Sequence, residues 1–407
     1  MSTDQAVLAA ATDQLADLVD LRRRLHRRPE VGLYLPHTQQ AVLDALEAAD
    51  LPVEIAAGSG EVSWVTATLT GTAARPDGDE PVLLLRGDMD ALPMPEDTGL
   101  DYASTVDGAM HACGHDAHVA MLVGAARVLA DRRDELAGTV KFLFQPGEEG
   151  HHGARYCIKE GVLDAPAVTA AFALHITPNL PSGVVAGRPG PLLASADEFD
   201  VTVVGRGGHA SSPHLAADPI PAAAEIVLAL QSLITREIDA FDPAVLTVAS
   251  MRAGTATNVI AETARLEGTI RAVSDRTRDA VHAGLVRVAN HVAEAHGCHA
   301  DVDLAIGYPV TVNNGAEAAR AAAVVRSLLG QRAYLELRQP MMGAEDWSYV
   351  LERVPGSMAF LGVCPPGQAP ATAASVHSNR MTLDEDAMAI GTAVHAAVAL
   401  NRLQPEG

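Results

Sequence analysis

Short apolar runs alternate with helical patterns in this chain of 407 residues, and this alternation constrains its fold most strongly. Pro81–Leu85, Thr139–Phe144 and Ala170–Leu174 suit strands, the first of them buried on both faces. Helical patterns follow at Asp116–Leu129 and around Gly153–Gly161. Strands and helices in this order are typical of an α/β domain with a largely parallel sheet.

The order of the expected elements changes after about Ala194. The next patterns run strand–helix–strand–strand–helix–strand, which matches the split βαβ unit of ferredoxin-like domains. From Gly307 the first pattern resumes. We therefore expect one domain formed by residues 1–194 and 307–407, with a smaller α+β domain, residues 195–306, inserted into it. The six inserted segments are Glu198–Val204, Pro219–Thr235, Ala244–Arg252, Glu262–Ala272, Asp275–Ala295 and His299–Ile306.

Charge and composition exclude several classes of partner. The formal net charge of −22 argues against nucleic acid, because phosphate binding requires a basic surface. A basic run is the local exception, and we expect it to form one face and the exit of a first helix, Leu8–Arg28, that Pro29 ends. The run consists of Arg22, Arg23, Arg24, His26, Arg27 and Arg28.

The sequence predicts no membrane or secretory segment. The first residues lack a basic and apolar leader, and the most apolar late stretch, Ala387–Leu400, is too short to span a bilayer. The four cysteines are scattered without the spacing of a disulfide framework. We therefore expect a cytoplasmic protein.

Metal-binding side chains follow the expected strands. Cys113 and His115 precede an apolar helix, Glu149 follows a strand in a glycine-flanked turn, and His175 and His377 lie at two further strand-to-loop corners. Each alone is more often a core or surface residue. Ligands of open α/β sheets bind at the carboxyl ends of the strands, so together these five side chains predict a site for two ions. Sulfur, nitrogen and oxygen ligands favour zinc, manganese, cobalt or nickel over magnesium and calcium.

The adjacent residues Glu148 and Glu149 suggest two different roles at the site. The pair could be a solvated acidic turn, but two glutamates directly after a buried strand suit a site in which one binds metal and the other acts on water. Five metal-binding side chains and one additional glutamate are the residues that a metal-activated hydrolase requires.

Five motifs resemble the metal-dependent amidohydrolase family. It contains bacterial N-acyl-amino acid hydrolases, hippurate hydrolases and plant auxin–amino acid conjugate hydrolases, and is a branch of the group with aminoacylase and carboxypeptidase G. The resemblance runs in order over nearly the whole chain. The motifs are Arg86-Gly-Asp-Met-Asp-Ala-Leu-Pro93, Met110-His-Ala-Cys-Gly-His-Asp116, Gln145-Pro-Gly-Glu-Glu-Gly150, Gly208-His-Ala-Ser-Ser-Pro-His214 and Val376-His-Ser-Asn-Arg380.

The resemblance implies a zinc-peptidase-like catalytic domain with a mixed, mostly parallel sheet, and an inserted lid or dimerisation domain. It implies that Glu148 is the catalytic base beside two divalent ions, often manganese or zinc. The implied ligands are the five residues found above: Cys113, His115, Glu149, His175 and His377.

Further residues take roles only through the resemblance. Asp88 stands where aminopeptidase-like relatives carry a ligand histidine, so a direct metal contact is doubtful, and Asp90 is better placed to orient the site. His209 would donate to the oxyanion in a partner subunit's site, which requires at least a homodimer. Asn258 and Arg271 would contact the substrate carboxylate, the alternative being a turn residue and a surface residue of a strand.

The expected activity is hydrolysis of the amide bond of N-acyl amino acids, as in hippurate hydrolases, by a metal-bound hydroxide with Glu148 as general base. One alternative is a dipeptidase or carboxypeptidase that acts on short peptides. A non-catalytic metal-binding protein is the remote alternative, because a metal store has no use for a base such as Glu148. The acyl group, the amino acid and the physiological metal are open at this stage.

Overall fold

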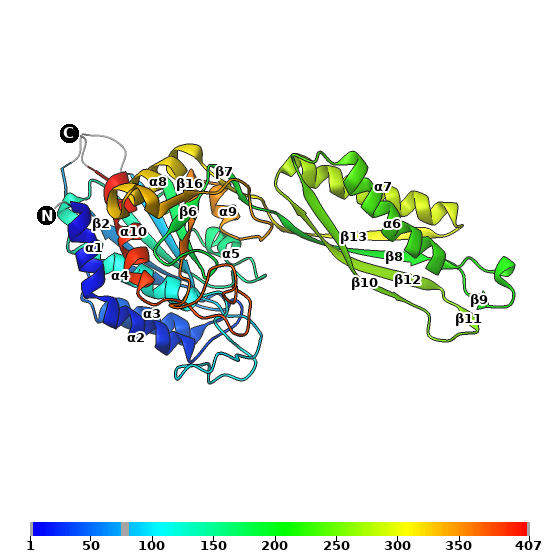
Figure 1. The fold of residues 1–407 in the computed structure, drawn as a ribbon, viewed down its shortest axis with the longest axis horizontal. Helices are drawn as coiled ribbons and strands as arrows, with labels where there is room; N and C mark the ends of the chain where they lie inside the picture. Colours follow the sequence, from blue (N-terminus) through cyan, green and yellow to red (C-terminus); the bar gives the residue numbers. More distant parts are fainter. Residues whose placement is uncertain (1–2, 75–80, 405–407) are drawn as a thin grey trace. The chain divides into compact units, whose positions relative to one another are not determined.

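The computed structural model describes residues 3–74 and 81–404, which form two compact units (Figure 1). The first unit combines the chain up to Gly190 with Val312–Arg338 and the residues from Tyr349 onwards. The second unit contains Pro191–Thr311 and Gln339–Ser348. The domain boundaries expected from the sequence, at 194/195 and 306/307, stay a prediction.

The first unit is built on an eight-stranded mixed sheet in the order β1-β2-β4-β3-β5-β16-β6-β15. Its central strands β4, β3, β5 and β16 are parallel neighbours, and every residue of β3 and β4 is buried, as the apolar runs predict. The strands are β1 (Glu54–Ala57), β2 (Val65–Thr70), β3 (Val82–Asp88), β4 (Thr139–Gln145), β5 (Ala170–Thr177), β6 (Val185–Gly187), β15 (Tyr334–Glu336) and β16 (Gly356–Gly362).

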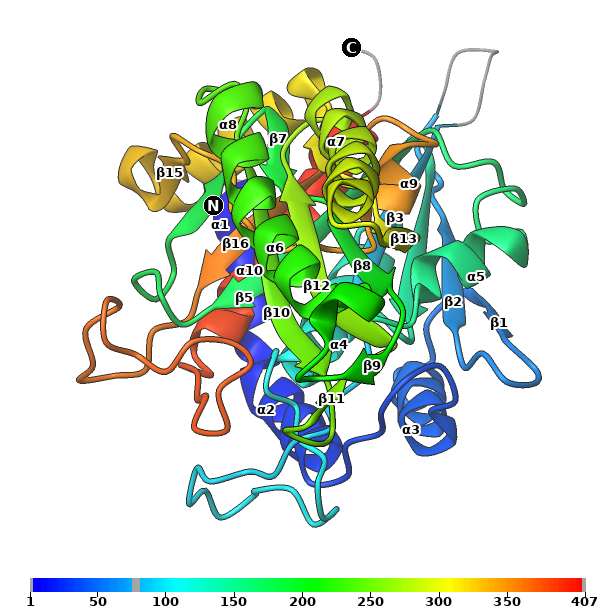
Figure 2. The same ribbon diagram turned by 90° about the vertical axis from the view of Figure 1, so that its right-hand side faces the viewer.

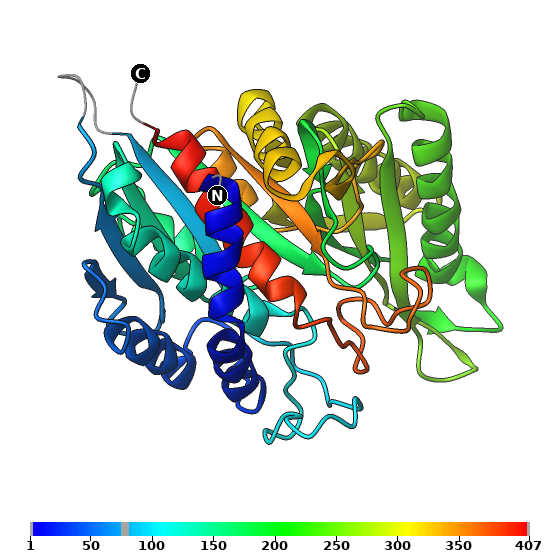
Figure 3. The same cartoon turned by 60° about the vertical axis from the view of Figure 1, so that its left-hand side comes forward.

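Helices α4 and α10 pack against each other and against the central strands β3 and β5. Both helices are alanine-rich and almost wholly buried, so they lie close to the sheet. Figure 3 shows α1 in blue crossing α10 in red on this face. The helices are α1 (Thr3–Asp13), α2 (Leu15–His26), α3 (Pro36–Glu47), α4 (His115–Ala130), α5 (Gly153–Lys159), α8 (Gly315–Leu329), α9 (Ser348–Leu351) and α10 (Ala387–Arg402).

The first expected helix differs from the prediction in two ways. It is interrupted at Gln14, so α1 and α2 replace the single helix Leu8–Arg28. The basic run also does not form one face of a helix, because its side chains are divided between the interior and the surface. Arg24 and Arg28 are exposed, but Arg22 and His26 are buried, because their side chains find carboxylate partners inside the unit.

The second unit has the expected order β8-α6-β10-β12-α7-β13. Its four strands are all antiparallel, in the order β10-β12-β8-β13, and α6 and α7 lie over one face of this sheet (Figure 2). Apolar side chains such as Phe199, Leu230 and Leu266 fill the space between the helices and the sheet. The elements are β8 (Ala196–Val204), α6 (Pro219–Glu237), β10 (Ala244–Ala253), β12 (Thr263–Ala272), α7 (Asp275–Ala295) and β13 (His299–Tyr308).

Two small sheets complete the fold. Strand β9 (Gly208–His209) pairs with β11 (Val259–Ile260), and β7 (Gly190–Leu193) pairs with β14 (Thr311–Asn313). Among the described residues, no helix has the length and apolar character needed to cross a membrane. The predicted class, an α/β unit with a mostly parallel mixed sheet and an inserted α+β unit, is confirmed.

Candidate metal centre

The carboxyl ends of β3, β4 and β5 lie side by side in the sheet and bring the predicted site residues together. Asp88, the last residue of β3, is in register with Gln145, the last residue of β4. Glu148 and Glu149 follow β4 directly, and His175 lies near the end of β5. Parallel strands thus deliver three segments remote in the sequence to one edge of the sheet.

All five predicted ligands meet at this edge. Cys113 Sγ lies 3.4 Å from His175 Nε2, and His377 Nε2 lies 3.1 Å from Glu149 Oε1. His115 Nε2 lies 3.9 Å from the same Glu149 oxygen. Three overlapping groups of ligand atoms each lie within 4.8 Å of one another: Cys113, His115 and His175; Cys113, Glu149 and His377; and His115, Glu148 and Glu149. The overlap suits two neighbouring ions better than one.

The backbone fixes the direction of two imidazoles. His175 donates from Nδ1 to the carbonyl oxygen of Ile176 at 2.6 Å, which leaves Nε2 to face Cys113. His377 has φ of 66°, an uncommon conformation for a residue other than glycine, and its N–H donates to Ala112. Strained backbone of this kind is often found at functional sites.

Gly114, between Cys113 and His115, is required by its surroundings. Its φ is 83°, and a Cβ atom there would lie 2.6 Å from the side chain of Ile176. Only glycine lets the chain turn into α4 so close to β5. This turn places Cys113 in the loop and His115 at the first position of the helix.

Asp90 holds the turn that carries the two glutamates. Its carboxylate accepts the backbone N–H of Glu148 at 3.0 Å and that of Glu149 at 2.9 Å. It also lies 3.4 Å from Nδ1 of His115. Asp90 therefore contacts the backbone of two site residues and the side chain of a third, as expected of a residue that orients ligands.

Asp88 is engaged from two sides. Arg86 donates to it at 2.5 Å, and His118 Nδ1 lies 2.5 Å from its other oxygen. Because His118 Nε2 accepts the N–H of Ile176, Nδ1 carries the hydrogen and donates to Asp88. Asp88, His115 and His118 also lie within 4.8 Å of one another. The two hydrogen bonds favour an orienting role for Asp88 over direct metal binding.

Burial and charge at the site fit bound cations. Burial, followed by Glu149 and Glu148, raises the pKa of the Cys113 thiol well above its usual value. Burial lowers the pKa of His115, but Asp88 and Asp90 outweigh this and raise it to about 10. Neither ring nitrogen of His115 has acceptable hydrogen-bond geometry with another described residue. Buried, crowded acidic groups around such an imidazole are stabilised by divalent cations, and these donor types suit zinc or manganese.

The second unit brings together two of its three predicted residues. His209 in β9 pairs with Val259, directly after Asn258, and Ala210 N–H donates to the Asn258 carbonyl. His209 Nδ1 accepts the N–H of Ser211 at 3.1 Å, so its hydrogen is on Nε2, which can act as a donor. Strand β12 begins at Thr263, shortly after Asn258 and β11, and Arg271 lies near its last residue. Arg271 is eight residues from Thr263, or about 26 Å at the rise of a strand.

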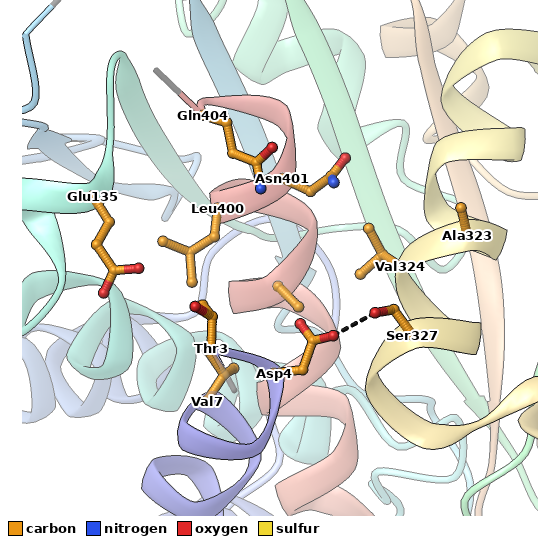
Figure 4. A pocket seen from close by; sticks show the side chains of 11 residues that line it. Thr3, Asp4, Val7, Glu135, Ala323, Val324, Ser327, Leu400, Asn401 and Gln404 are labelled. Carbon is orange, nitrogen blue, oxygen red and sulfur yellow. Dashed lines mark hydrogen bonds between the residues drawn. The ribbon is translucent and has the colours of Figure 1, made fainter. Parts of the chain in front are cut away.

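A separate hollow on the first unit lacks the predicted metal-binding residues. It measures about 590 Å³ and lies between α1, α8 and α10. Figure 4 shows Ser327 of α8 donating to Asp4 of α1 at its wall. None of the predicted metal-binding residues lines it.

Known proteins are similar in sequence to this chain over nearly its full length. A sequence profile of the peptidase family M20/M25/M40 matches residues 84–401. An Arabidopsis thaliana protein named IAA-amino acid hydrolase ILR1-like 2 is 38% identical over 95% of this chain and 85% of its own. The N-acetylcysteine deacetylase of Bacillus subtilis strain 168 is 37% identical over 94% and 96%.

Two further proteins extend the comparison. Thermostable carboxypeptidase 1 of Saccharolobus solfataricus is 34% identical over 94% of either chain. The crystal structure of the Bacillus subtilis YXEP protein, described as a dinuclear metal binding peptidase, has a TM-score of 0.82 and 33% identity. It covers 96% of this chain and 98% of that one.

Proposed function

Because the chain belongs to the amidohydrolase branch of the peptidase family M20/M25/M40, we propose that this hydrolase cleaves the amide bond of N-acyl amino acids. The observation that carries the proposal is the meeting of Cys113, His115, Glu149, His175 and His377 beside Glu148. We assign the first five to two divalent cations, with manganese or zinc as the first candidates and cobalt or nickel as others.

Two such cations would make a water molecule acidic near neutral pH and polarise the carbonyl of the substrate. Glu148 is the base in this assignment. Its carboxylate accepts a proton from the water that attacks the amide carbon, and returns it to the nitrogen as the C–N bond breaks. The products are a carboxylate and the free amino acid. Asp90 supports this role because it fixes the backbone of Glu148.

His209 donates from Nε2 to the oxyanion in this proposal, and Asn258 and Arg271 bind the carboxylate of the substrate. The pair His209–Asn258 lies by the first residue of β12, Thr263, and about 26 Å of strand separates Thr263 from Arg271, which is far longer than an N-acyl amino acid. One substrate molecule therefore cannot contact Arg271 and the pair His209–Asn258 of the same chain. We infer that the pair acts on the substrate of a second copy, and that the enzyme is a homodimer or a higher oligomer. A cytoplasmic location stays a prediction.

A carboxypeptidase is the second candidate, and the similarity to thermostable carboxypeptidase 1 favours it. A substrate panel separates the two. N-acetyl and N-benzoyl amino acids and dipeptides are assayed after treatment with a chelator, and again after Mn²⁺ or Zn²⁺ is added.

We expect no hydrolysis after chelation, recovery with metal, and a higher kcat/KM for N-acyl amino acids than for dipeptides. The opposite preference would favour the peptidase. No hydrolysis of either class by metal-restored protein would refute the proposal.

A further inference from the structure

Two residues of the basic run lie inside the first unit. Arg22 and His26 are one turn apart on α2, and their side chains are 1% and 0% exposed. A buried guanidinium is costly unless carboxylates compensate it. Arg24 and Arg28 of the same basic run are exposed to solvent. The burial is therefore specific to Arg22 and His26 and is not a property of the whole run.

Both side chains bind the same oxygen of Asp116. Arg22 Nε donates to Asp116 Oδ2 at 2.9 Å, and His26 Nδ1 lies 2.8 Å from that atom. Arg22 Nη1 also donates to Glu385 at 2.8 Å and to the Tyr102 hydroxyl at 3.0 Å. One planar guanidinium thus holds three partners at once, a geometry that arginine allows and lysine does not.

Asp116 directly follows the predicted ligand His115 in the first turn of α4. This helix start has no side-chain cap, so the contacts of Asp116 help to fix its first turn. Consecutive helical residues point about 100° apart. Arg22 and His26 therefore hold Asp116 from α2, while His115 faces Asp90 and Glu149.

The same network reaches the segments of other predicted ligands. His26 Nε2 lies 3.3 Å from Glu96, and the next residue, Asp97, donates its N–H to the carbonyl of Asn379. Asn379 is two residues after His377. Glu385, bound by Arg22, anchors the chain after His377, and Ala112, which accepts the N–H of His377, precedes Cys113.

We propose that Arg22 and His26 are positioning residues of the metal centre. Through Asp116 they fix the start of α4 and thereby the direction of His115, and through Glu96 and Glu385 they restrain the segment of His377. This inference rests on the proposed function, because it requires that these histidines bind metal.

The test compares Arg22→Met and His26→Asn with Arg24→Met. Arg24 lies on the same helix, is 53% exposed and pairs only with Asp20 among the ion pairs of the described residues, so its replacement is the matched control. Purified metal-free proteins are titrated with Co²⁺ and Zn²⁺. The readouts are the affinity and the visible absorption spectrum of bound Co²⁺, which reports ligand geometry.

We expect Arg22→Met and His26→Asn to bind metal 10- to 100-fold more weakly, as is typical when partners of metal ligands are removed, with an altered Co²⁺ spectrum. Arg24→Met matches the wild type. Arg22→Lys retains the charge but not the fork, and falls between the wild type and Arg22→Met.

A purely structural role predicts another pattern. The variants would then unfold at lower urea concentration, while the folded protein keeps wild-type affinity and spectrum, and that result overturns the inference. Far-UV circular dichroism shows which variants are folded. If Arg22→Met does not fold, His26→Asn and Arg22→Lys decide the question. Failure of the wild type to bind two cations refutes the proposed function instead.

Discussion

At the scale of single residues, the account depends on a division between two adjacent glutamates. The Glu149 carboxylate lies near Cys113, His115 and His377, whereas Glu148 shares a group of ligand atoms with His115 and Glu149 but not with Cys113 or His377. Asp90 holds both backbone N–H groups, so the two side chains start from one fixed turn. We assign metal binding to Glu149 and proton transfer to Glu148.

The variant Glu148→Gln tests this division. Glutamine has nearly the shape of glutamate but cannot accept the proton, so we expect kcat to fall by roughly 10²- to 10⁴-fold, the usual contribution of a general base. Metal content, measured by mass spectrometry of the metals, stays at two ions per chain. Glu47→Gln, an exposed position on α3, is the control. Near-normal turnover in Glu148→Gln would remove the residue from the mechanism.

Sequence reasoning at this scale found the residues with a metal-binding side chain, and the family resemblance added Asp90, but the contacts of Arg22 and His26 were missed. His175 and Glu149 could be predicted because they follow apolar runs at strand ends, and Cys113 because it precedes an apolar helix. The partners of Arg22 are up to 363 residues away in the chain, so their pairing has no local signal. A buried arginine in a basic run looks like a solvated one until the tertiary contacts are known.

At the scale of elements, Asp197 joins three parts of the inserted unit. At the start of β8, it accepts hydrogen bonds from Arg278 Nε at 2.8 Å and from the N–H of Gly307 at 3.0 Å, and lies 2.9 Å from His282 Nε2. Burial raises the pKa of this carboxyl, but Arg278, His282 and Gly307 outweigh this and hold it well below the usual range.

The variant Asp197→Asn should lower the free energy of unfolding by about 3–5 kcal/mol at pH 7, because it removes a buried carboxylate that pairs with Arg278. A carboxyl with a lowered folded pKa stabilises the protein fully above its unfolded pKa of about 3.9 and loses this contribution as the pH falls towards the folded pKa. The difference between wild type and variant should therefore shrink below about pH 4.

Urea denaturation at several pH values measures this difference, with Asp301→Asn on β13, whose side chain is 73% exposed, as the control. An equal loss of stability in both variants, or a difference that does not change in acid, would contradict the assignment.

The elements themselves were predicted where periodicity or burial is strong. Helix α7 has the predicted bounds, Asp275–Ala295, and the buried strands differ by a few residues. The short strands β1, β6 and β15 were not predicted, because three or four residues carry no clear alternation. The break between α1 and α2 at Gln14 was also missed, since neither glycine nor proline marks it.

At the scale of the whole molecule, the proposed second copy explains why His209 and Asn258, in and beside the β9–β11 pair, lie near the opposite end of β12 from Arg271. Mixed oligomers test it. His209→Ala and Glu148→Gln should each be nearly inactive, the first because loss of an oxyanion donor costs about 10²- to 10³-fold in kcat. In a mixed dimer, one site combines an intact Glu148 with an intact partner His209.

Random exchange between equal amounts of the two variants should restore about a quarter of wild-type activity, because half of the dimers are mixed and each has one complete site. Native mass spectrometry verifies that exchange has occurred. Absence of recovery despite exchange would show that His209 acts within its own chain or not at all.

The central claim is that a thiolate, three imidazoles and a carboxylate, remote in the sequence, hold two cations beside Glu148. Anomalous X-ray diffraction from crystals grown with zinc or manganese tests it most directly. The account predicts two peaks, bonded at about 2.0–2.3 Å by Cys113, His115, Glu149, His175 and His377 and by no residue outside this edge of the sheet. A single peak, or ions held by other side chains while these five remain unbound, would contradict it.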